Sequence, residues 1–368
     1  MNAIENIRNI VARNWQKQSL RARFSYLKTV LVRIFFQPPH YFTYQSTASE
    51  NQLPKVYLEI TNINYSRYLY LLIKFFSIAG YQVYLPANLF FFYQLKADRH
   101  TQHILKEKLV RFGQPAAAKV ISKTQISSNY FAGLLSDKVA VNTYYLPISQ
   151  HPLMYQGGHW NAPIAMPAKR KQSAFIIGRC TLEYEQIVKD GIFNVASRIA
   201  TWQFLQQANS YFPLTNNDEL HDFIHSNIDK KVLLADVTQL QISPVELRNT
   251  LTQFDFYLAL SGQVMPLCHN IVEAMSVGCI PIVQSAYAQL LQPSLLDEQE
   301  AILYTDLAEL PNVLERAFAL DLATIERMRK AVNTYYNEYL TPTKVVQRVL
   351  DSEQIYLLAE HYSVEQLK

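Results

Sequence analysis

Short apolar segments typical of strands alternate with amphipathic helical segments along most of this chain, and this order limits the fold more than any other feature. The first such unit begins at Lys55. Segments 55–60 and 81–86 have strand character, and between them apolar residues recur at helical spacing up to Gly80. Ser66 is the expected cap of this helix. A polar, helix-like stretch over 96–112 follows, and then two strand-like segments at 118–122 and 139–147.

The second half of the chain repeats this order. Strand-like segments are expected at 173–178, 231–236, 254–260, 279–283 and 301–304. Between the second and third, Ser243, Pro244 and Glu246 form a helix start, with a capping box and a proline in the first turn. Strands that alternate with helices predict parallel sheets covered by helices on both faces. The expected fold class is therefore α/β, with two Rossmann-like, doubly wound domains.

The length of 368 residues suits two such domains. Prolines and the Gly157–Gly158 pair interrupt the pattern between 151 and 167, as expected of a linker. We therefore expect an N-terminal domain over 1–150, a linker over 151–167, a C-terminal domain over 168–342 and a C-terminal helix over 343–368.

The composition excludes several classes of protein. Charged residues are only 17% of the chain, against 49% hydrophobic residues, which indicates a folded globular protein. Three cysteines without metal-ligand spacing suggest a reducing compartment. No apolar segment has the length of a membrane span and no signal peptide is visible, so a cytoplasmic location is expected.

The first 40 residues are strongly basic. They hold seven Lys and Arg residues and one acid, a net charge of +6, whereas the whole chain has only +4. Apolar residues lie between these charges at helical spacing, so this basic arm could bind an anionic membrane surface. The alternative is an ordinary helix packed on its own domain. No nucleic-acid motif accompanies the charge, and no nucleic-acid partner is expected.

The segment from Phe256 to Val283 has the strongest functional pattern. A buried strand ends in a loop with Ser261 and Gly262, and a helix is expected from about Cys268. In a doubly wound sheet, ligands bind at the carboxyl ends of the strands, and a helix N-terminus there favours a diphosphate. His269 and Glu273 are four residues apart and should share one face of this helix.

The same segment resembles the donor-binding signature of GT-B glycosyltransferases, in which a helix of the form N-x-x-E-A-M-x-x-G precedes a strand like IPIV. The wording GCIPIV is similar to the exostosin-like branch. The resemblance implies two domains facing a cleft, and it implies that Glu273 binds the ribose of a nucleotide sugar. The donor-binding residues expected on this basis are Gly178, Arg179, Ser261, Gly262, His269, Asn270 and Glu273.

The sequence departs from the family pattern at two positions. Many retaining GT-B enzymes have a second glutamate where this chain has Met265, and a lysine where it has Tyr184. These differences leave the retaining or inverting outcome open. Glu59, at the end of the first strand, is the expected catalytic base. His151 and His159 lie in the linker and could meet substrate.

The expected function is transfer of a sugar from a nucleotide-sugar donor to a glycan or lipid-linked acceptor, as in the assembly of bacterial surface polysaccharides or glycoconjugates. No cofactor or metal is expected, because no D-x-D or similar motif is present, and the absence of G-x-G-x-x-G argues against a dehydrogenase. His221 and His225, four apart among acids, fit a solvated helix face better than a metal site. Two alternatives stay open: a nucleotide-sugar epimerase of similar build, and a non-catalytic protein that binds nucleotide sugars.

Overall fold

A computed structural model of the chain describes residues 53–136, 142–180, 191–208, 210–263, 265–359 and 361–367, without the side chains of 361 and 362. The basic arm, and Tyr184 with its neighbours, lie outside the described residues. The expectations on them stay predictions.

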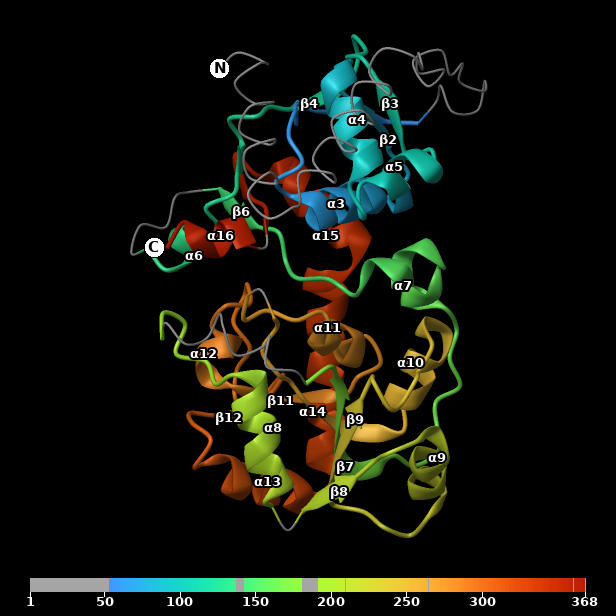
Figure 1. Cartoon of the computed structure of the whole chain (residues 1–368), viewed down its shortest axis with the longest axis vertical. Coiled ribbons are helices and arrows are strands. Elements are labelled where there is room, and N and C mark those ends of the chain that lie inside the picture. Colours follow the sequence, from blue (N-terminus) through green and yellow to red (C-terminus); the bar gives the residue numbers. More distant parts are fainter. Residues whose placement is uncertain are drawn as a thin grey trace, which may run out of the picture.

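The N-terminal domain is built on a parallel sheet with the strand order β3-β2-β1-β4 (Figure 1). Its strands are β1 (Lys55–Leu58), β2 (Gln82–Leu85), β3 (Val110–Phe112) and β4 (Lys119–Ile121). Helices α3 (Ser66–Ile78), α4 (Leu89–Ala97) and α5 (Gln102–Lys106) connect them. Helix α3 buries its side chains almost all round, from Tyr68 to Phe76, which explains its run of large apolar residues.

Two local expectations for this domain are wrong. Ser66 does not cap α3 but is its first residue, and its hydroxyl donates to the Asp98 carboxylate at 2.9 Å. The stretch 96–112 is not one helix: it holds the end of α4, then α5 and strand β3. Thr101, fully buried, helps to separate the two helices, because its hydroxyl donates to the Leu95 carbonyl and its amide to Asp98.

The C-terminal domain has a parallel sheet with the order β12-β11-β10-β7-β9-β8. Its strands are β7 (Lys171–Gly178), β8 (Tyr211–Pro213), β9 (Val232–Asp236), β10 (Phe254–Leu258), β11 (Ile280–Gln284) and β12 (Ile302–Tyr304). From β7 the chain first moves to β8 and β9 on one side, and then crosses to β10 on the other. The carboxyl ends of β7 and β10 therefore flank the point where the strand order reverses, which is where open α/β sheets bind ligands.

The helices of this domain are α8 (Arg198–Gln206), α9 (Asn217–His225), α10 (Pro244–Leu251), α11 (Asn270–Met275), α12 (Ser285–Ala288), α13 (Leu310–Ala319) and α14 (Leu322–Tyr335). Parallel crossovers are right-handed, so the change of direction at β8 puts α8 on one face of the sheet and α9 and α10 on the other (Figure 1). The capping box of Ser243 and Glu246 is present at α10, as predicted. The expected α/β class with parallel, doubly wound sheets is confirmed.

The end of the chain returns to the N-terminal domain. After α14 and a π-helical turn (Tyr336–Leu340), α15 (Pro342–Asp351) packs against α3. Strand β13 (Gln354–Tyr356) then lies between β5 (Ile126–Ser127) and β6 (Thr143–Tyr145) in a small parallel sheet beside α6 (Tyr130–Leu134) and α16 (His361–Glu365) (Figure 1). The expected single helix over 343–368 is therefore wrong, and this third sheet was not expected from the sequence.

The segment 151–167 runs between the two domains, but it is not all irregular. His151 caps the short helix α7 (Pro152–Gln156), since its ring Nδ1 accepts from the Leu153 amide at 3.2 Å. A 3₁₀ turn (His159–Asn161) follows. Among the described helices, none combines the length and apolar character needed to cross a bilayer.

Candidate functional site

A cavity of about 410 Å³ lies between the two domains. Its lower wall comes from the carboxyl ends of the large sheet: Gly178 ends β7, Val237 follows β9, and the loop 262–270 follows β10. Its upper wall comes from the first turn of α3, from Arg99 before α5 and from Ile148. The volume suits a small-molecule ligand, and the position is the one expected from the reversal of strand order.

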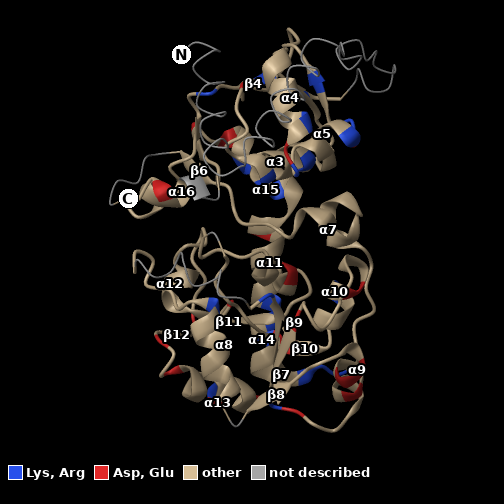
Figure 2. Cartoon of the chain, in the orientation of Figure 1, with Lys and Arg blue, Asp and Glu red and all other residues tan. Residues whose placement is uncertain are grey.

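Among the described residues, four arginines line this cavity and no Asp or Glu does. Arg67 and Arg99 belong to the N-terminal domain, and Arg179 and Arg198 to the C-terminal domain. Figure 2 shows Lys and Arg on both domains where these face each other, on α3 and α5 above and at the upper end of α8 below. Charges of one sign around a concave site attract and hold ligands of the opposite charge. The cavity is therefore suited to an anion.

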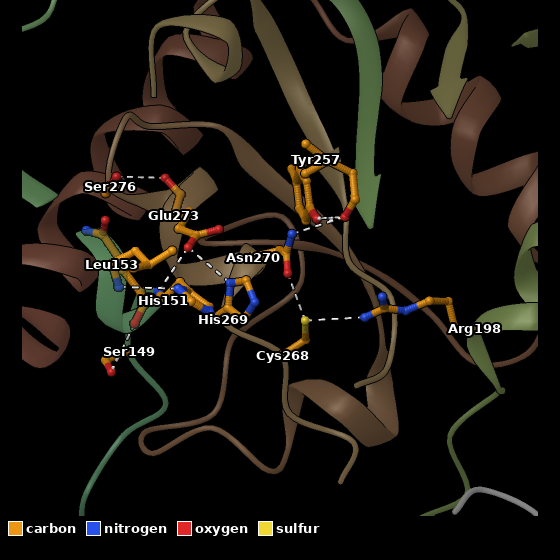
Figure 3. Close-up of polar contacts among 12 residues, drawn as sticks. Ser149, His151, Leu153, Arg198, Tyr257, Cys268, His269, Asn270, Glu273 and Ser276 are labelled. Carbon is orange, nitrogen blue, oxygen red and sulfur yellow. Dashed lines mark hydrogen bonds and ion pairs between the residues drawn. The ribbon is translucent and has the colours of Figure 1, made fainter. Parts of the chain in front are cut away.

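Arg198 is the fixed cation of the lower wall. It is the first residue of α8 and only 4% exposed. Its Nε donates to the Ser261 carbonyl at 2.9 Å, its Nη1 to the Arg179 carbonyl at 3.1 Å, and its Nη2 approaches Cys268 Sγ at 3.4 Å (Figure 3). The guanidinium thus joins three loops at the lower wall of the cavity.

At two of the expected glycine positions, neighbouring atoms lie too close for any side chain. A Cβ on Gly178 would stand 2.8 Å from Arg198 Nη1, and a Cβ on Gly262 would stand 2.5 Å from the Met265 carbonyl oxygen. Both contacts are too short for a side chain. Gly178 and Gly262 therefore serve the shape of the lower wall, and Met265 contributes to it as a buried lining residue.

The start of α11 is held by side chains. Asn270 donates to the Ile177 carbonyl at the end of β7 at 3.0 Å and accepts from Cys268 Sγ at 2.9 Å. The Cys268 amide donates to the Tyr287 hydroxyl at 2.8 Å, so it is not free for a phosphate. Helix α11 has only six residues. Its N-terminus should therefore contribute less positive charge to the cavity than the arginines do.

Glu273 lies behind the cavity and is not part of its lining. It is 1% exposed. Its Oε1 accepts from His269 Nδ1 at 3.0 Å and from the His151 amide at 2.9 Å (Figure 3), so the expected shared helix face of His269 and Glu273 is confirmed. Its other oxygen, Oε2, is buried without a hydrogen-bond partner among the described residues.

The charges around Glu273 depend on one another. Burial would raise the pKa of Glu273, but the charge and hydrogen bond of His269, together with the His151 amide, outweigh burial and lower it. The rings of His151 and His269 are 5.0 Å apart. Burial, with His269 and Arg67 nearby, lowers the pKa of His151 to about 3 despite Glu273. His151 is thus neutral beside a charged Glu273.

The remaining expected residues are divided between the cavity and other places. Arg179 and His269 line the cavity, and Arg179 is exposed. Ser261 is buried next to it, with its hydroxyl donating to the Ala196 carbonyl at 3.1 Å. Glu59 is not among the lining residues. Its carboxylate accepts from the Lys123 amide at 3.1 Å, on the β4 side of β1.

The histidines away from the cavity form no metal site in the described part of the chain. His221 and His225 lie together on α9 with their ring centroids 4.1 Å apart, and no group of three potential metal ligands was found within the described ranges. His159 follows α7 and makes no contact with the cavity lining in the hydrogen bonds described for it.

Sequence reasoning did not find Arg67, Arg99 or Arg198. Each stands just before or within the first turn of a helix, where the sequence shows only an isolated arginine with no motif around it. The only available signal for Arg198 is the N-cap Ser197 before it, which places it in the first turn of a helix that follows a sheet strand.

Comparison with known proteins gives no match to a protein-family model and no match among curated proteins. Among solved structures, the chain is similar to HepE of Anabaena, solved with UDP and glucose, with 12% identity, 81% of this chain and 98% of that chain covered, and a TM-score of 0.38. It is also similar to a glycosyltransferase from Rickettsia africae, with 10% identity, coverages of 86% and 99%, and a TM-score of 0.41. A third is WaaG, a glycosyltransferase of lipopolysaccharide biosynthesis, with 9% identity, coverages of 80% and 98%, and a TM-score of 0.31.

Proposed function

We propose that this chain is a glycosyltransferase that binds a nucleotide-sugar donor in the interdomain cavity and transfers the sugar to an acceptor bound against the N-terminal domain. One observation carries the proposal: a cavity at the carboxyl ends of β7 and β10 whose described lining holds arginines and no acid. A diphosphate is the anion that this position in a doubly wound sheet most often binds.

The reaction needs positive charge at one place. The bond between the anomeric carbon and the β-phosphate oxygen breaks, the acceptor oxygen forms the new bond to that carbon, and the acceptor proton passes to a base. Negative charge then grows on the leaving diphosphate. Arg198, already fixed by its three contacts, supplies preorganised positive charge, and Arg179 can grip two phosphate oxygens at once. The proposal therefore needs no metal ion.

Glu273 keeps the role that the family resemblance implies. A buried carboxylate oxygen without a donor is costly, and a ribose hydroxyl would supply one to Oε2. Because Glu273 is 1% exposed and its Oε1 holds the His151 amide, the segment at His151 must move before ribose can reach it. Glu59 has no part in this proposal, since its carboxylate lies outside the cavity lining.

The finer assignments rest on the sequence. We propose that the acceptor is a glycan or a lipid-linked sugar of a surface polysaccharide or glycoconjugate, and that the basic arm holds the enzyme at an anionic membrane surface. Each Lys or Arg near such a surface contributes about 1 kcal/mol, reduced by salt. Co-sedimentation with phosphatidylserine vesicles should recover the full chain in the pellet at low salt, and a chain without residues 1–40 in the supernatant. Equal recovery of both in the supernatant contradicts the membrane role.

The donor site is tested by ligand-induced stabilisation. Each of the common nucleoside diphosphates and nucleotide sugars is added to the full chain, and a ligand that binds only the folded state raises the unfolding midpoint. At least one nucleotide should do so. Incubation of the matching nucleotide sugar without acceptor separates the main alternative, because an epimerase converts its substrate alone.

The Arg179 variants then test the placing of the diphosphate. Arg179→Ala should lower turnover about 10²–10³-fold, the usual effect of removing a group that stabilises developing negative charge, and Arg179→Lys should lower turnover more than donor affinity. His269→Ala should do less than Arg179→Ala. Turnover of Arg179→Ala at the wild-type rate would remove this arginine from the site.

A further inference from the structure

The proposed transfer needs a base for the acceptor proton, and the described lining of the cavity offers one such group, His269. Arginine cannot give up its proton at neutral pH, and tyrosine and cysteine side chains keep theirs. The Cys268 thiol donates to Asn270 Oδ1 at 2.9 Å. Histidine is the side chain that takes up a proton near neutral pH. The His269 side chain is 26% exposed, so its ring can be reached from the cavity.

A hydrogen bond to Glu273 decides which ring nitrogen of His269 is free. Nδ1 lies 3.0 Å from Glu273 Oε1, and Figure 3 shows the two side chains pointing toward each other. Burial would raise the pKa of Glu273, but His269 and the His151 amide lower it, so the carboxylate is charged and can only accept. Nδ1 therefore carries the proton of this bond. In the neutral ring, the lone pair is on Nε2.

A buried carboxylate behind a histidine has a specific chemical effect. It holds the ring in one orientation and one tautomer, and it stabilises the imidazolium that forms when the other nitrogen takes up a proton. Glu273 is suited to this role because it is 1% exposed and its Oε1 is also held by the His151 amide at 2.9 Å. Its Oε2 stays available for the ribose.

The same tautomer separates a base from a ligand of the diphosphate. Phosphate oxygens accept hydrogen bonds, and a lone pair on Nε2 has no proton to give them, whereas a hydroxyl of the acceptor can donate to it. His269 could bind a phosphate only after Nε2 had taken up a proton. A base must be neutral and a phosphate ligand must be charged, so the two roles respond to pH in opposite directions.

We propose that His269 is the general base of the transfer. Its Nε2 takes the proton of the acceptor hydroxyl while the acceptor oxygen bonds to the anomeric carbon, and the diphosphate leaves with the electron pair of the broken bond. The imidazolium then loses its proton to water. This single displacement inverts the configuration at the anomeric carbon. The inference rests on the proposed function and adds a catalytic residue and the stereochemical outcome, with Glu273 as a positioning residue.

His269 stands among groups of both charges. Glu273 is on its own helix, and the ring of His151, neutral because burial lowers its pKa to about 3, has its centroid 5.0 Å from the His269 ring. Over about pH 5 to 8, arginines and a carboxylate with a lowered pKa stay charged, and tyrosine and cysteine hold their protons. The other described charged or titratable groups of the cavity are Arg67, Tyr68, Arg99, Arg179, Arg198 and Cys268.

The kinetic test uses the full chain with water as the acceptor. The donor is the nucleotide sugar that matches the nucleoside diphosphate identified by the stabilisation screen. Release of the diphosphate should slow as the pH is lowered from about 8 to about 5, because a protonated ring cannot accept. NMR of the sugar released first should show the inverted anomer.

Variants assign the pH dependence to His269. His269→Gln should lower the rate about 10²-fold, the lower end of what a general base contributes, and should remove the pH dependence. Its affinity for the nucleoside diphosphate should change less than about threefold. Glu273→Gln should move the pH at which the rate falls, because the charge behind the ring is lost. His221→Gln, at an exposed histidine outside the described lining, should change none of these.

A second measurement does not depend on turnover, so it decides the question even where hydrolysis is too slow to follow. NMR of the full chain with isotope-labelled histidine nitrogens reports which ring nitrogen carries the proton. With the nucleoside diphosphate bound at about pH 8, His269 should show a protonated Nδ1 and a bare Nε2. The signals that disappear in His269→Gln belong to this ring.

Several outcomes overturn the inference while the proposed function stands. A protonated Nε2 in the nucleotide complex at about pH 8, or a rate that rises as the pH falls, would make His269 a ligand of the diphosphate. Retention of the anomeric configuration, or a wild-type pH profile in His269→Gln, would show that His269 is not the base. If the chain binds no nucleoside diphosphate, the proposed function fails first, and the inference falls with it.

Discussion

The two walls of the interdomain cavity differ in how their polar groups are satisfied. On the C-terminal wall, Arg198 and Asn270 each hold two or more described partners, so their positions are fixed before any ligand arrives. On the N-terminal wall, Arg67 has two buried nitrogens without a partner among the described residues. The polar groups of the lower wall are held by the protein itself, whereas Arg67 on the upper wall keeps two buried donors that the described residues do not satisfy.

The largest expected effect comes from breaking the fixed wall. Arg198→Ala leaves the Ser261 and Arg179 carbonyls without their donor, which should cost about 3 kcal/mol of unfolding free energy and about 10² or more in nucleotide affinity. Urea unfolding and calorimetry measure the two losses. Arg248→Ala is the matched control, because Arg248 is also buried and donates to the His159 and Ala162 carbonyls, but away from the cavity.

Arg248→Ala should lose a similar amount of stability and keep nucleotide affinity in the folded fraction. If both variants lose affinity equally, the effect of Arg198 is a general loss of structure, and the lower wall has no special role in binding.

Glu273→Gln tests the carboxylate that binds both His269 and the His151 amide between the two domains. The change should weaken nucleoside diphosphate binding by about 1–3 kcal/mol, because a charged acceptor for buried hydroxyls is lost. The fold should survive, since an amide oxygen can still accept from the His151 amide. Glu326→Gln, on the exposed side of α14, should change nothing. Wild-type affinity in a folded Glu273→Gln protein would exclude Glu273 from the nucleotide site.

A smaller effect concerns His151, which faces His269, Arg67 and Glu273 and has its pKa lowered from 6.5 to about 3. Between these pH values the unfolded chain binds a proton that the folded chain does not. Stability therefore falls as the pH falls below 6.5, by up to about 1.4 kcal/mol per pH unit from this residue. His151→Asn keeps a cap for α7 and should flatten the stability profile between pH 6.5 and 5.

Urea unfolding at several pH values measures this slope. His221→Asn, at an exposed position of α9, should leave the slope as it is. An unchanged slope in His151→Asn would mean that His151 is not held neutral at the junction of the domains.

The last prediction is that removal of divalent metal ions has no effect. If the arginines alone balance the leaving diphosphate, a chelator should leave the rate of sugar transfer unchanged within error. A complete loss that added Mg²⁺ or Mn²⁺ restores would show that the arginine-lined wall does not act alone.

Local signals predicted the parts of the fold that local physics decides. Apolar runs located the central strands, and the pair Ser243 and Glu246 located the start of α10, because a capping box lies within four residues of sequence. The same logic failed at Ser66, where Asp98, distant in sequence, binds the hydroxyl that was expected to cap the helix. Tertiary contact there outweighs the local preference.

For the candidate site, the sequence allowed a prediction only on the side of the C-terminal domain, and there only for part of the residues. Glu273 and His269 stand in one recognisable segment, so their pairing could be anticipated. Arg67 and Arg99 come from separate segments of the N-terminal domain, and they share a cavity with Arg198 of α8 only because the two domains face each other. No periodicity in a single sequence shows which loops share a cavity, and isolated arginines are common on surfaces.

The small three-stranded sheet has a consequence for biosynthesis. Its central strand is β13, whose residues are translated after those of the whole six-stranded sheet. On the ribosome, the C-terminal domain can therefore complete its sheet while the N-terminal domain still lacks β13 and α15. Nascent domains generally fold in the order of their synthesis, and here the first domain to begin is the last to finish. Until then the edges of β5 and β6 that receive β13 stay open to chaperones and to wrong partners.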